Sequence, residues 1–192
     1  LTRFGDEDFM VHGRGGFWLA YNLEQGNYDA SVTNEDWFMY QVSGPNALAL
    51  LKKLSGSQDL ADTRYMRAVT ITVVGHEIFA LRQGMAGEVG FELQGPRSIG
   101  AEIYQAVLES GREFGIRKMG GRIAMINHLE ASFPTIATDY IPAIFDDDMS
   151  GYREYFLSSM PPFAKPAYIN GSYDGKDISE YYRSPIELGW AK

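Results

Sequence analysis

Cysteine is absent from this chain of 192 residues, and histidine occurs only three times. The lack of cysteine excludes a disulfide framework and a thiolate metal site, and it fits a cytoplasmic protein. The three histidines, His12, His76 and His128, form no pair with metal-ligand spacing, so no metal site is indicated. No serine lies in a nucleophile elbow, which leaves covalent hydrolase chemistry without support.

Positive charge is also in short supply, with 17 Lys and Arg against 25 Asp and Glu and a net charge of −8. No basic cluster is present that would neutralise a run of phosphates, so we expect no nucleic-acid partner. No apolar run reaches the length of a membrane span, so we expect no membrane partner either. The chain begins at Leu1 without a methionine, within an expected strand, and we expect it to be an internal fragment.

The stretch from Val69 to Pro96 is the most informative part of the chain. Val69–Val74 and Glu77–Leu81 are rich in β-branched and aromatic residues, which predicts a hairpin with its turn at Gly75-His76. The loop GMAGEVGFE, residues 84–92, follows with two residues between successive glycines, and Glu92 lies on the strand that leaves it. Such glycines allow close approach of the backbone to a ligand, although a plain turn with bulges is the more frequent meaning of this spacing.

Two further segments share one pattern of a strand, a Gly-Pro pair and a helix. The first is strand Trp37–Val42 with helix Ala47–Leu54, and the second is strand Phe91–Leu93 with a helix that starts at a Ser98 N-cap. Together with the hairpin they predict an α+β fold, an antiparallel sheet with helices packed on one side, of ferredoxin-like type. We also expect strands at Leu1–Phe4 and Asp8–His12 and helices at Phe17–Leu23, Met119–Ala131 and Gly151–Phe156. The helix at Met119–Ala131 is expected to pack in the core through Ile123, Ile126 and Leu129 or through Met125 and Leu129.

The glycine loop GMAGEVGFE resembles the YTGExGFE signature of the folate-binding aminomethyltransferase family, which includes the T-protein of glycine cleavage. YQVSGPNALALL (40–51), LESGREFGIR (108–117) and HLEASFP (128–134) resemble other motifs of that family. The second half of the chain is most similar to the tetrahydrofolate-dependent aromatic O-demethylases of the vanillate and syringate type. The resemblance implies the remainder of a first folate-binding subdomain at 1–42, an α+β folate-binding subdomain at 43–135, and a wrapping segment at 136–192 that leads toward an absent C-terminal barrel.

The resemblance also implies a cofactor and its binding residues. The cofactor is tetrahydrofolate, whose pterin ring is bound in the family by the glutamate that matches Glu92. Gln41, Val42 and Met85 match positions near the same pocket. The implied reaction is methyl transfer from a small-molecule donor, with a methoxylated aromatic acid as the donor suggested by the demethylases.

Substrate and acid residues are implied less completely. Arg14 would pair with the carboxylate of a benzoate, and Phe133 would form an aromatic wall. The demethylases use a tyrosine as catalytic acid where this chain has Ala124, which cannot donate a proton. His128 is the candidate substitute, with Tyr140 as a second one. A glycine-cleavage type of aminomethyltransferase and a folate-binding module without catalysis are therefore the alternatives.

Overall fold

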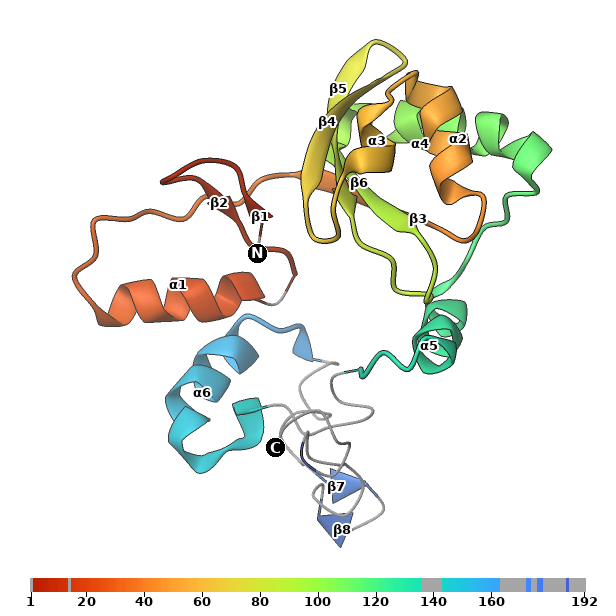
Figure 1. Cartoon of the computed structure of the whole chain (residues 1–192). Helices are drawn as coiled ribbons and strands as arrows, with labels where there is room; N and C mark the ends of the chain where they lie inside the picture. Colours follow the sequence, from red (N-terminus) through yellow and green to blue (C-terminus); the bar gives the residue numbers. More distant parts are fainter. Residues whose placement is uncertain are drawn as a thin grey trace. The chain divides into compact units, whose positions relative to one another are not determined.

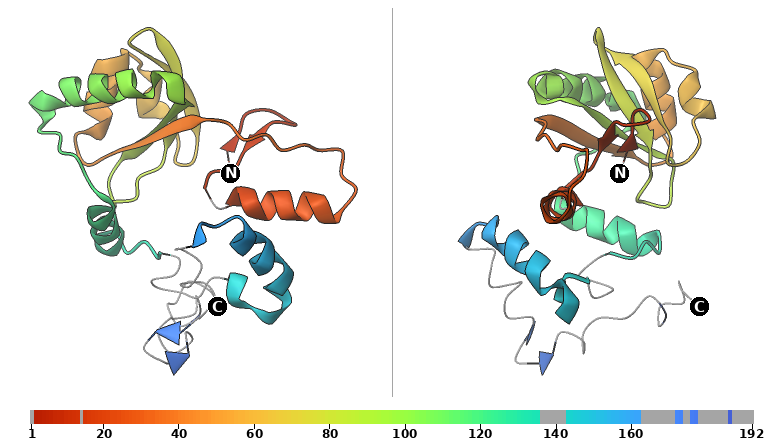
Figure 2. Two further views of the ribbon diagram at one scale, coloured as in Figure 1. Left: turned by 180° about the vertical axis from the view of Figure 1, so that it is seen from behind. Right: turned by 90° about the vertical axis from the view of Figure 1, so that its left-hand side faces the viewer.

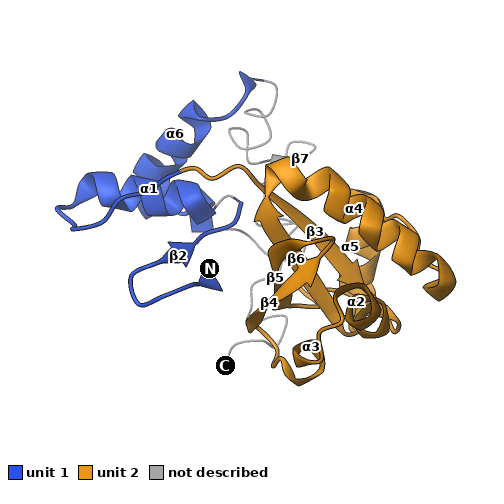
Figure 3. Ribbon diagram, turned by 90° about the horizontal axis from the view of Figure 1, so that it is seen from above, with its two compact units in different colours: residues 1–33, 136–192 blue, residues 34–135 orange. Residues whose placement is uncertain are grey.

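The computed structural model describes residues 2–13, 15–135, 143–162, 172–173, 176–177 and 186. The chain divides into two compact units, one of Asn34–Thr135 and one of Leu1–Thr33 with Ile136–Lys192 (Figure 3). The predicted subdomain boundary at 42/43 lies inside a strand of the first of these units. The folate-binding roles assigned to the subdomains stay predictions.

The unit of residues 34–135 is built on a four-stranded antiparallel sheet with the strand order β3-β6-β5-β4 (Figure 1). Its strands are β3 (Trp37–Ser43), β4 (Ala68–Val73), β5 (His76–Arg82) and β6 (Gly90–Pro96). Alternate residues of each strand point to the same face of the sheet, and on one face most of these residues are apolar and buried. The predicted antiparallel sheet is confirmed.

Helices cover that apolar face from one side (Figures 1 and 2). They are α2 (Ala47–Ser55), α3 (Asp59–Asp62) and α4 (Arg97–Gly111), and α4 is followed by a 3-10 turn, η1 (Arg112–Phe114). Leu51 of α2 and Ile103 of α4 are fully buried in the same core as Phe91 and Leu93 of β6. The predicted α+β layer with helices on one side is therefore confirmed.

The β4–β5 hairpin turns one residue earlier than the sequence predicts. Val74 and Gly75 both have positive φ, 44° and 83°, and His76 already pairs with Val73. Two central residues with positive φ make the tight turn that matches the twist of paired strands. Ile71 must lie opposite Ile78 for both to reach the core, and this pairing places the turn at Val74-Gly75 rather than Gly75-His76.

The junction of β6 and α4 also differs from the prediction. The strand continues through Gly95 and Pro96, and α4 begins at Arg97, so Ser98 lies inside the helix instead of capping it. A Cβ on Gly95 would lie 3.0 Å from the ring of Phe38, so glycine permits the close packing of β6 on β3. Pro96 can end the strand because the sheet needs no further N–H donor there.

Helix α5 (Gly121–Glu130) forms where a helix is predicted, but the prediction of a core helix is wrong. Ile123, Ile126 and Leu129 are 46%, 49% and 66% exposed. The less exposed positions are Ala124, Asn127, His128 and Ala131, which form one stripe along the helix. Periodicity predicts the helix, but it does not decide which side of the helix meets the rest of the unit.

The other unit contains a short hairpin, β1 (Thr2–Arg3) with β2 (Phe9–Met10), and two helices, α1 (Gly15–Gln25) and α6 (Ser150–Ser158). The helices contact each other through aromatic rings, with Phe17 against Phe156 at 5.4 Å and Trp18 against Tyr152 at 4.8 Å. The other elements among its described residues are η2 (Ala143–Phe145), η3 (Asp147–Met149), β7 (Ser172–Tyr173) and β8 (Lys176–Asp177). These elements confirm the predicted hairpin and both predicted helices, whereas most of the predicted wrapping segment lies outside the described residues.

Candidate functional site

The loop between β5 and β6 is shaped by its three glycines. A Cβ on Gly84 would overlap the carbonyl oxygen of Glu88, and a Cβ on Gly90 would lie 2.9 Å from Gln41 Nε2. Gly87 has a φ of +71°, which favours glycine. The close approach predicted from the spacing of the glycines is therefore an approach of the loop to its own chain.

Beside this loop, the sheet brings Gln41 and Glu92 together. Glu92 on β6 lies directly opposite Gln41 on β3 and Leu81 on β5, on the face away from the helices. Gln41 Nε2 donates hydrogen bonds to the Gln83 carbonyl oxygen at 2.8 Å and to Ser43 Oγ at 2.9 Å. Gln41 thus ties the start of the glycine loop to β3 and fixes the loop next to Glu92.

Gln94, two residues after Glu92 on the same face, is a site residue that the sequence analysis missed. It is only 1% exposed, and its Nε2 donates to Glu92 Oε2 at 3.3 Å. The rings of Trp37 and Phe79 stack at 5.9 Å, and since β6 separates their strands, this stack passes over β6 beside Gln94. Strand alternation placed Gln94 on the face of Glu92 and is the signal that would have identified it.

The polar groups of this face are incompletely paired. Burial raises the pKa of the Glu92 carboxyl above its usual range, and the hydrogen bond from Gln94 offsets only part of that effect. Gln94 Oε1 is buried and has no hydrogen-bond partner among the residues that the structure describes. A half-buried carboxylate next to an unpaired amide oxygen favours a ligand that brings several N–H donors. The N–H groups of a pterin ring meet this requirement.

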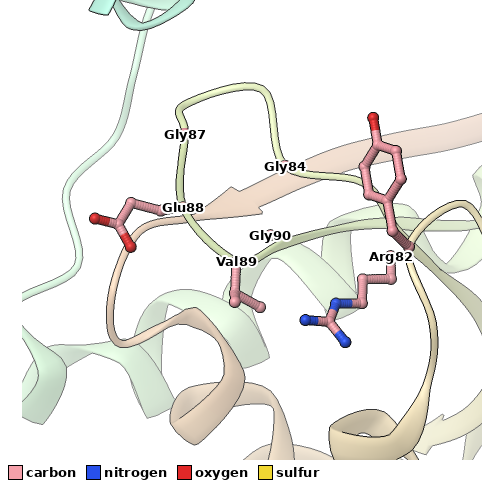
Figure 4. A pocket seen from close by; sticks show the side chains of 7 residues that line it. Arg82, Gly84, Gly87, Glu88, Val89 and Gly90 are labelled. Atoms are coloured by element: carbon pink, nitrogen blue, oxygen red, sulfur yellow. The ribbon is translucent and has the colours of Figure 1, made fainter. Parts of the chain in front are cut away.

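A hollow of about 250 Å³ lies at the other side of the loop (Figure 4). It is lined by Tyr65, Arg82, Gly84, Gly87, Glu88, Val89 and Gly90. Glu92 does not line it, because Arg82 lies opposite Phe91 and shares the helix-covered face of the sheet. This hollow and the Glu92 carboxyl, whose pKa is raised, thus lie on opposite faces of the β5–β6 hairpin.

His128 and Phe133 meet at the end of α5. Their rings lie 5.1 Å apart, and His128 Nδ1 is 3.1 Å from Thr135 Oγ1. A Cβ on Gly87 would lie 3.5 Å from the Cβ of Ala131, so the end of α5 contacts the tip of the glycine loop. His128 is on the same less exposed stripe of α5 as Ala124 and Ala131, which places the proposed proton donor on the side of the helix that contacts the loop.

The other residues predicted for the site lie in different parts of the molecule or outside its described residues. The side chain of Val42 is 8% exposed and belongs to the core, so only its backbone is available to a ligand on the outer face. Met85 lies in the glycine loop and is partly exposed. Arg14 and Tyr140 lie outside the described residues. In the described ranges, no group of three or more His, Asp or Glu side chains is arranged to hold a metal ion.

Among the described residues, no helix has the length and apolar character needed to cross a membrane.

Several known proteins have sequences similar to this chain, and three of them are compared with it here. A syringate O-demethylase from Sphingobium is 24% identical over 90% of this chain and 39% of its own length. A sesamin methylene transferase from Sinomonas is 31% identical over 92% of this chain and 40% of its own length. An aminomethyltransferase from Corynebacterium aurimucosum is 34% identical over 61% of this chain and 33% of its own length.

The chain thus spans about two fifths of the length of the first two of these curated relatives. The pattern that describes the GCVT N-terminal domain matches residues 1–148, which is most of the chain. This match includes the four strands of the sheet, the glycine loop and the whole of α5. The chain belongs to the family of the GCVT N-terminal domain.

Proposed function

We propose that this chain is the folate-binding part of a tetrahydrofolate-dependent one-carbon transferase. The observation that carries the proposal is the outer face of β6, where Glu92 has a raised pKa and the neighbouring Gln94 Oε1 has no partner within the described residues. The names of the relatives add the reaction class, since they include an O-demethylase, a methylene transferase and an aminomethyltransferase. A cytoplasmic location is part of this proposal.

Glu92 would hold the pterin ring by accepting hydrogen bonds from its N–H groups, and Gln41 would keep the glycine loop in place beside it. Bound tetrahydrofolate supplies a nitrogen that accepts the one-carbon unit. Positioning is the main contribution of these residues, because methyl transfer needs the acceptor atom in line with the bond that breaks. Met85 and the backbone of Val42 are the further contacts proposed on this side of the sheet.

Within the family, the aromatic O-demethylase type is the proposed reaction. His128 would donate a proton to the departing phenolate oxygen, with Thr135 holding its Nδ1 and Phe133 packed against the ring. Arg14 is proposed to pair with the substrate carboxylate. The methyl donor in this proposal is a methoxylated aromatic acid.

Calorimetric titration with tetrahydrofolate tests the cofactor site. Glu92→Gln should weaken binding by about 1.5–3 kcal/mol, because charge-assisted hydrogen bonds become neutral ones. Glu77→Gln is the matched control, since Glu77 lies on the same face of β5 but is exposed and lies next to the hairpin turn. Equal affinity of the wild-type chain and Glu92→Gln would remove Glu92 from the site.

A folate-binding module without catalysis is the second candidate, and Ala124 is the observation that favours it. Ala124 stands on the less exposed stripe of α5, one turn before His128, and offers no acidic hydrogen. Demethylation of methoxybenzoates by the protein that carries this chain separates the two candidates. If the protein is an enzyme that uses His128 as its acid, His128→Ala should lower turnover by ~10²–10⁴-fold and leave the folate affinity unchanged. Inert wild-type and Ala124→Tyr proteins that still bind folate identify a binding module.

A further inference from the structure

Arg82 lies at the end of β5, on the face of the sheet opposite to Glu92. It pairs with Phe91, which is fully buried beneath the helices. Its backbone N–H donates to the Arg67 carbonyl oxygen at 2.9 Å, and its carbonyl oxygen accepts from Met66 N–H at 2.8 Å. Hydrogen bonds from both the N–H and the carbonyl group of Arg82 therefore hold its backbone in place. These bonds do not involve the proposed folate site.

The guanidinium of Arg82 is only partly paired. Nη1 donates to the Thr63 carbonyl oxygen at 2.6 Å. Nε and Nη2 have no hydrogen-bond partner, and the group forms no ion pair, within the ranges that the structure describes. A half-buried guanidinium with a free planar edge is suited to donate two parallel hydrogen bonds to a carboxylate.

The hollow at Arg82 offers an apolar surface beside this charge. In Figure 4 the side chain of Val89 and the guanidinium of Arg82 lie on the same side of the loop, while the carboxylate of Glu88 points away from Arg82. The backbones of Gly84 and Gly90 form another part of the wall. No acidic side chain of the lining therefore neutralises Arg82.

We propose that this hollow binds a small organic carboxylate, with its oxygens on the free edge of Arg82 and its apolar part against Val89. The volume of about 250 Å³ is below the range of roughly 300–1,000 Å³ typical of pockets for drug-sized ligands, so the ligand is a compact molecule with a single ring or a short chain. The site is separate from the row of Gln41, Glu92 and Leu81. Loss of one site leaves the other intact.

Nuclear magnetic resonance titration of the whole chain with benzoate tests this site. The backbone amide signals of Gly84, Gly87 and Gly90 should shift in a saturable manner, because these residues line the hollow. Arg82→Lys should weaken benzoate by about tenfold, since lysine keeps the charge but lacks the planar fork. Arg64→Gln is the matched control and should leave the affinity unchanged, because Arg64 is exposed on the neighbouring loop and does not line the hollow.

Two further ligands complete the experiment. Benzamide, a neutral molecule of the same shape, should cause no saturable shift, and inorganic phosphate should not displace benzoate. Binding of benzamide as strong as that of benzoate, or equal losses in Arg82→Lys and Arg64→Gln, would overturn the proposal. Displacement by phosphate would overturn the assignment to carboxylates.

A second variant covers the case in which Arg82→Lys fails to fold. Val89→Asp places a carboxylate beside the guanidinium and should abolish the benzoate shifts, because the new side chain takes the free edge of Arg82. Val89 is only partly buried but packs against the core, so the amide signals of residues outside the hollow must keep their wild-type positions in Val89→Asp for the comparison to count. Unchanged benzoate affinity in Val89→Asp would also overturn the proposal.

Discussion

The two faces of β6 differ in the chemical character of their side chains, which are apolar on one face and polar on the other. Phe91 and Leu93 are fully buried in the core beneath the helices. Glu92 and Gln94 lie on the opposite face, where the Glu92 carboxyl has a raised pKa and Gln94 Oε1 has no partner among the described residues. Apart from Arg82 and the hollow at the end of β5, the inner face is apolar and packs as one core with the helices. The outer face keeps polar groups in an environment that does not satisfy them, as expected for residues that serve a ligand rather than the fold.

This difference in chemistry implies a difference in energetics. On the inner face, removing atoms leaves a cavity and lowers stability. On the outer face, replacing the half-buried charged carboxyl by a neutral group removes the cost of desolvating the charge. This change should raise the stability of the unliganded chain. Substitutions on the two faces of the same strand should therefore change the free energy of unfolding in opposite directions.

The largest effect is expected for Leu93→Ala on the inner face. Leu93 is fully buried, and truncation of such a leucine destabilises by about 2–5 kcal/mol. Met39→Ala on the outer face of β3 is the control, since Met39 is 46% exposed and should change stability by less than about 0.5 kcal/mol. Urea unfolding of both variants gives the comparison. Equal losses would show that the outer face is as tightly packed as the inner face.

The inner face is the part of the molecule that sequence reasoning predicts well. On β4, Val69 and Ile71 alternate with Thr70 and Thr72, a period of two that predicts a strand with one covered face. On β5 the residues from Ile78 to Leu81 are apolar throughout, and their β-branched and aromatic character predicts the strand. The turn lies one residue before the predicted position, because the pairing of Ile71 with Ile78 is set by tertiary packing and not by the local sequence. The end of β6 was missed because Gly95 and Pro96 usually end a strand, and here they pack against β3.

The outer face and α5 were harder to predict. The family motif predicted a site role for Glu92, which stays a prediction, but it gave no signal for Gln94, which lies beside the stacked rings of Trp37 and Phe79 from two other strands. Sequence periodicity favoured the apolar side of α5 as its packed side. The structure instead turns Ala124 and His128 inward, because the contact of Ala131 with Gly87 orients the helix. Such contacts between distant segments have no local signal in the sequence.

A smaller effect of opposite sign is expected for Glu92→Gln. Burial raises the pKa of Glu92, so the folded chain binds this proton more tightly than the unfolded chain. The contribution of Glu92 to stability is therefore greatest below the ordinary pKa of a glutamate, falls as the pH rises to the raised pKa, and is constant above it. Glu92→Gln removes this fall and should stabilise the chain at neutral pH by up to about 1 kcal/mol, since water still reaches part of the carboxylate.

Urea unfolding of the wild type and of Glu92→Gln across the acidic to neutral range measures this effect. The difference between the two should grow with pH and then level off. Glu77→Gln, on the same face but exposed, should show no such growth. A difference that shrinks as the pH rises would mean that the carboxylate of Glu92 stabilises the fold, and the contrast between the two faces would be lost.

The smallest change in stability is expected for Gln94→Met, in which two effects oppose each other. Methionine removes the buried Oε1 that has no partner in the described part of the chain, which favours folding. It also removes the hydrogen bond from Nε2 to Glu92 Oε2, which disfavours folding by a similar amount. The net change should stay within about 0.5 kcal/mol, but the pKa of Glu92 should rise further, because its carboxylate loses a donor. A carbon-detected magnetic resonance titration of the Glu92 carboxyl follows that pKa, with Met39→Leu as a control that leaves both polar groups in place. A pKa that stays at the wild-type value would show that Gln94 has no part in setting the charge of the outer face.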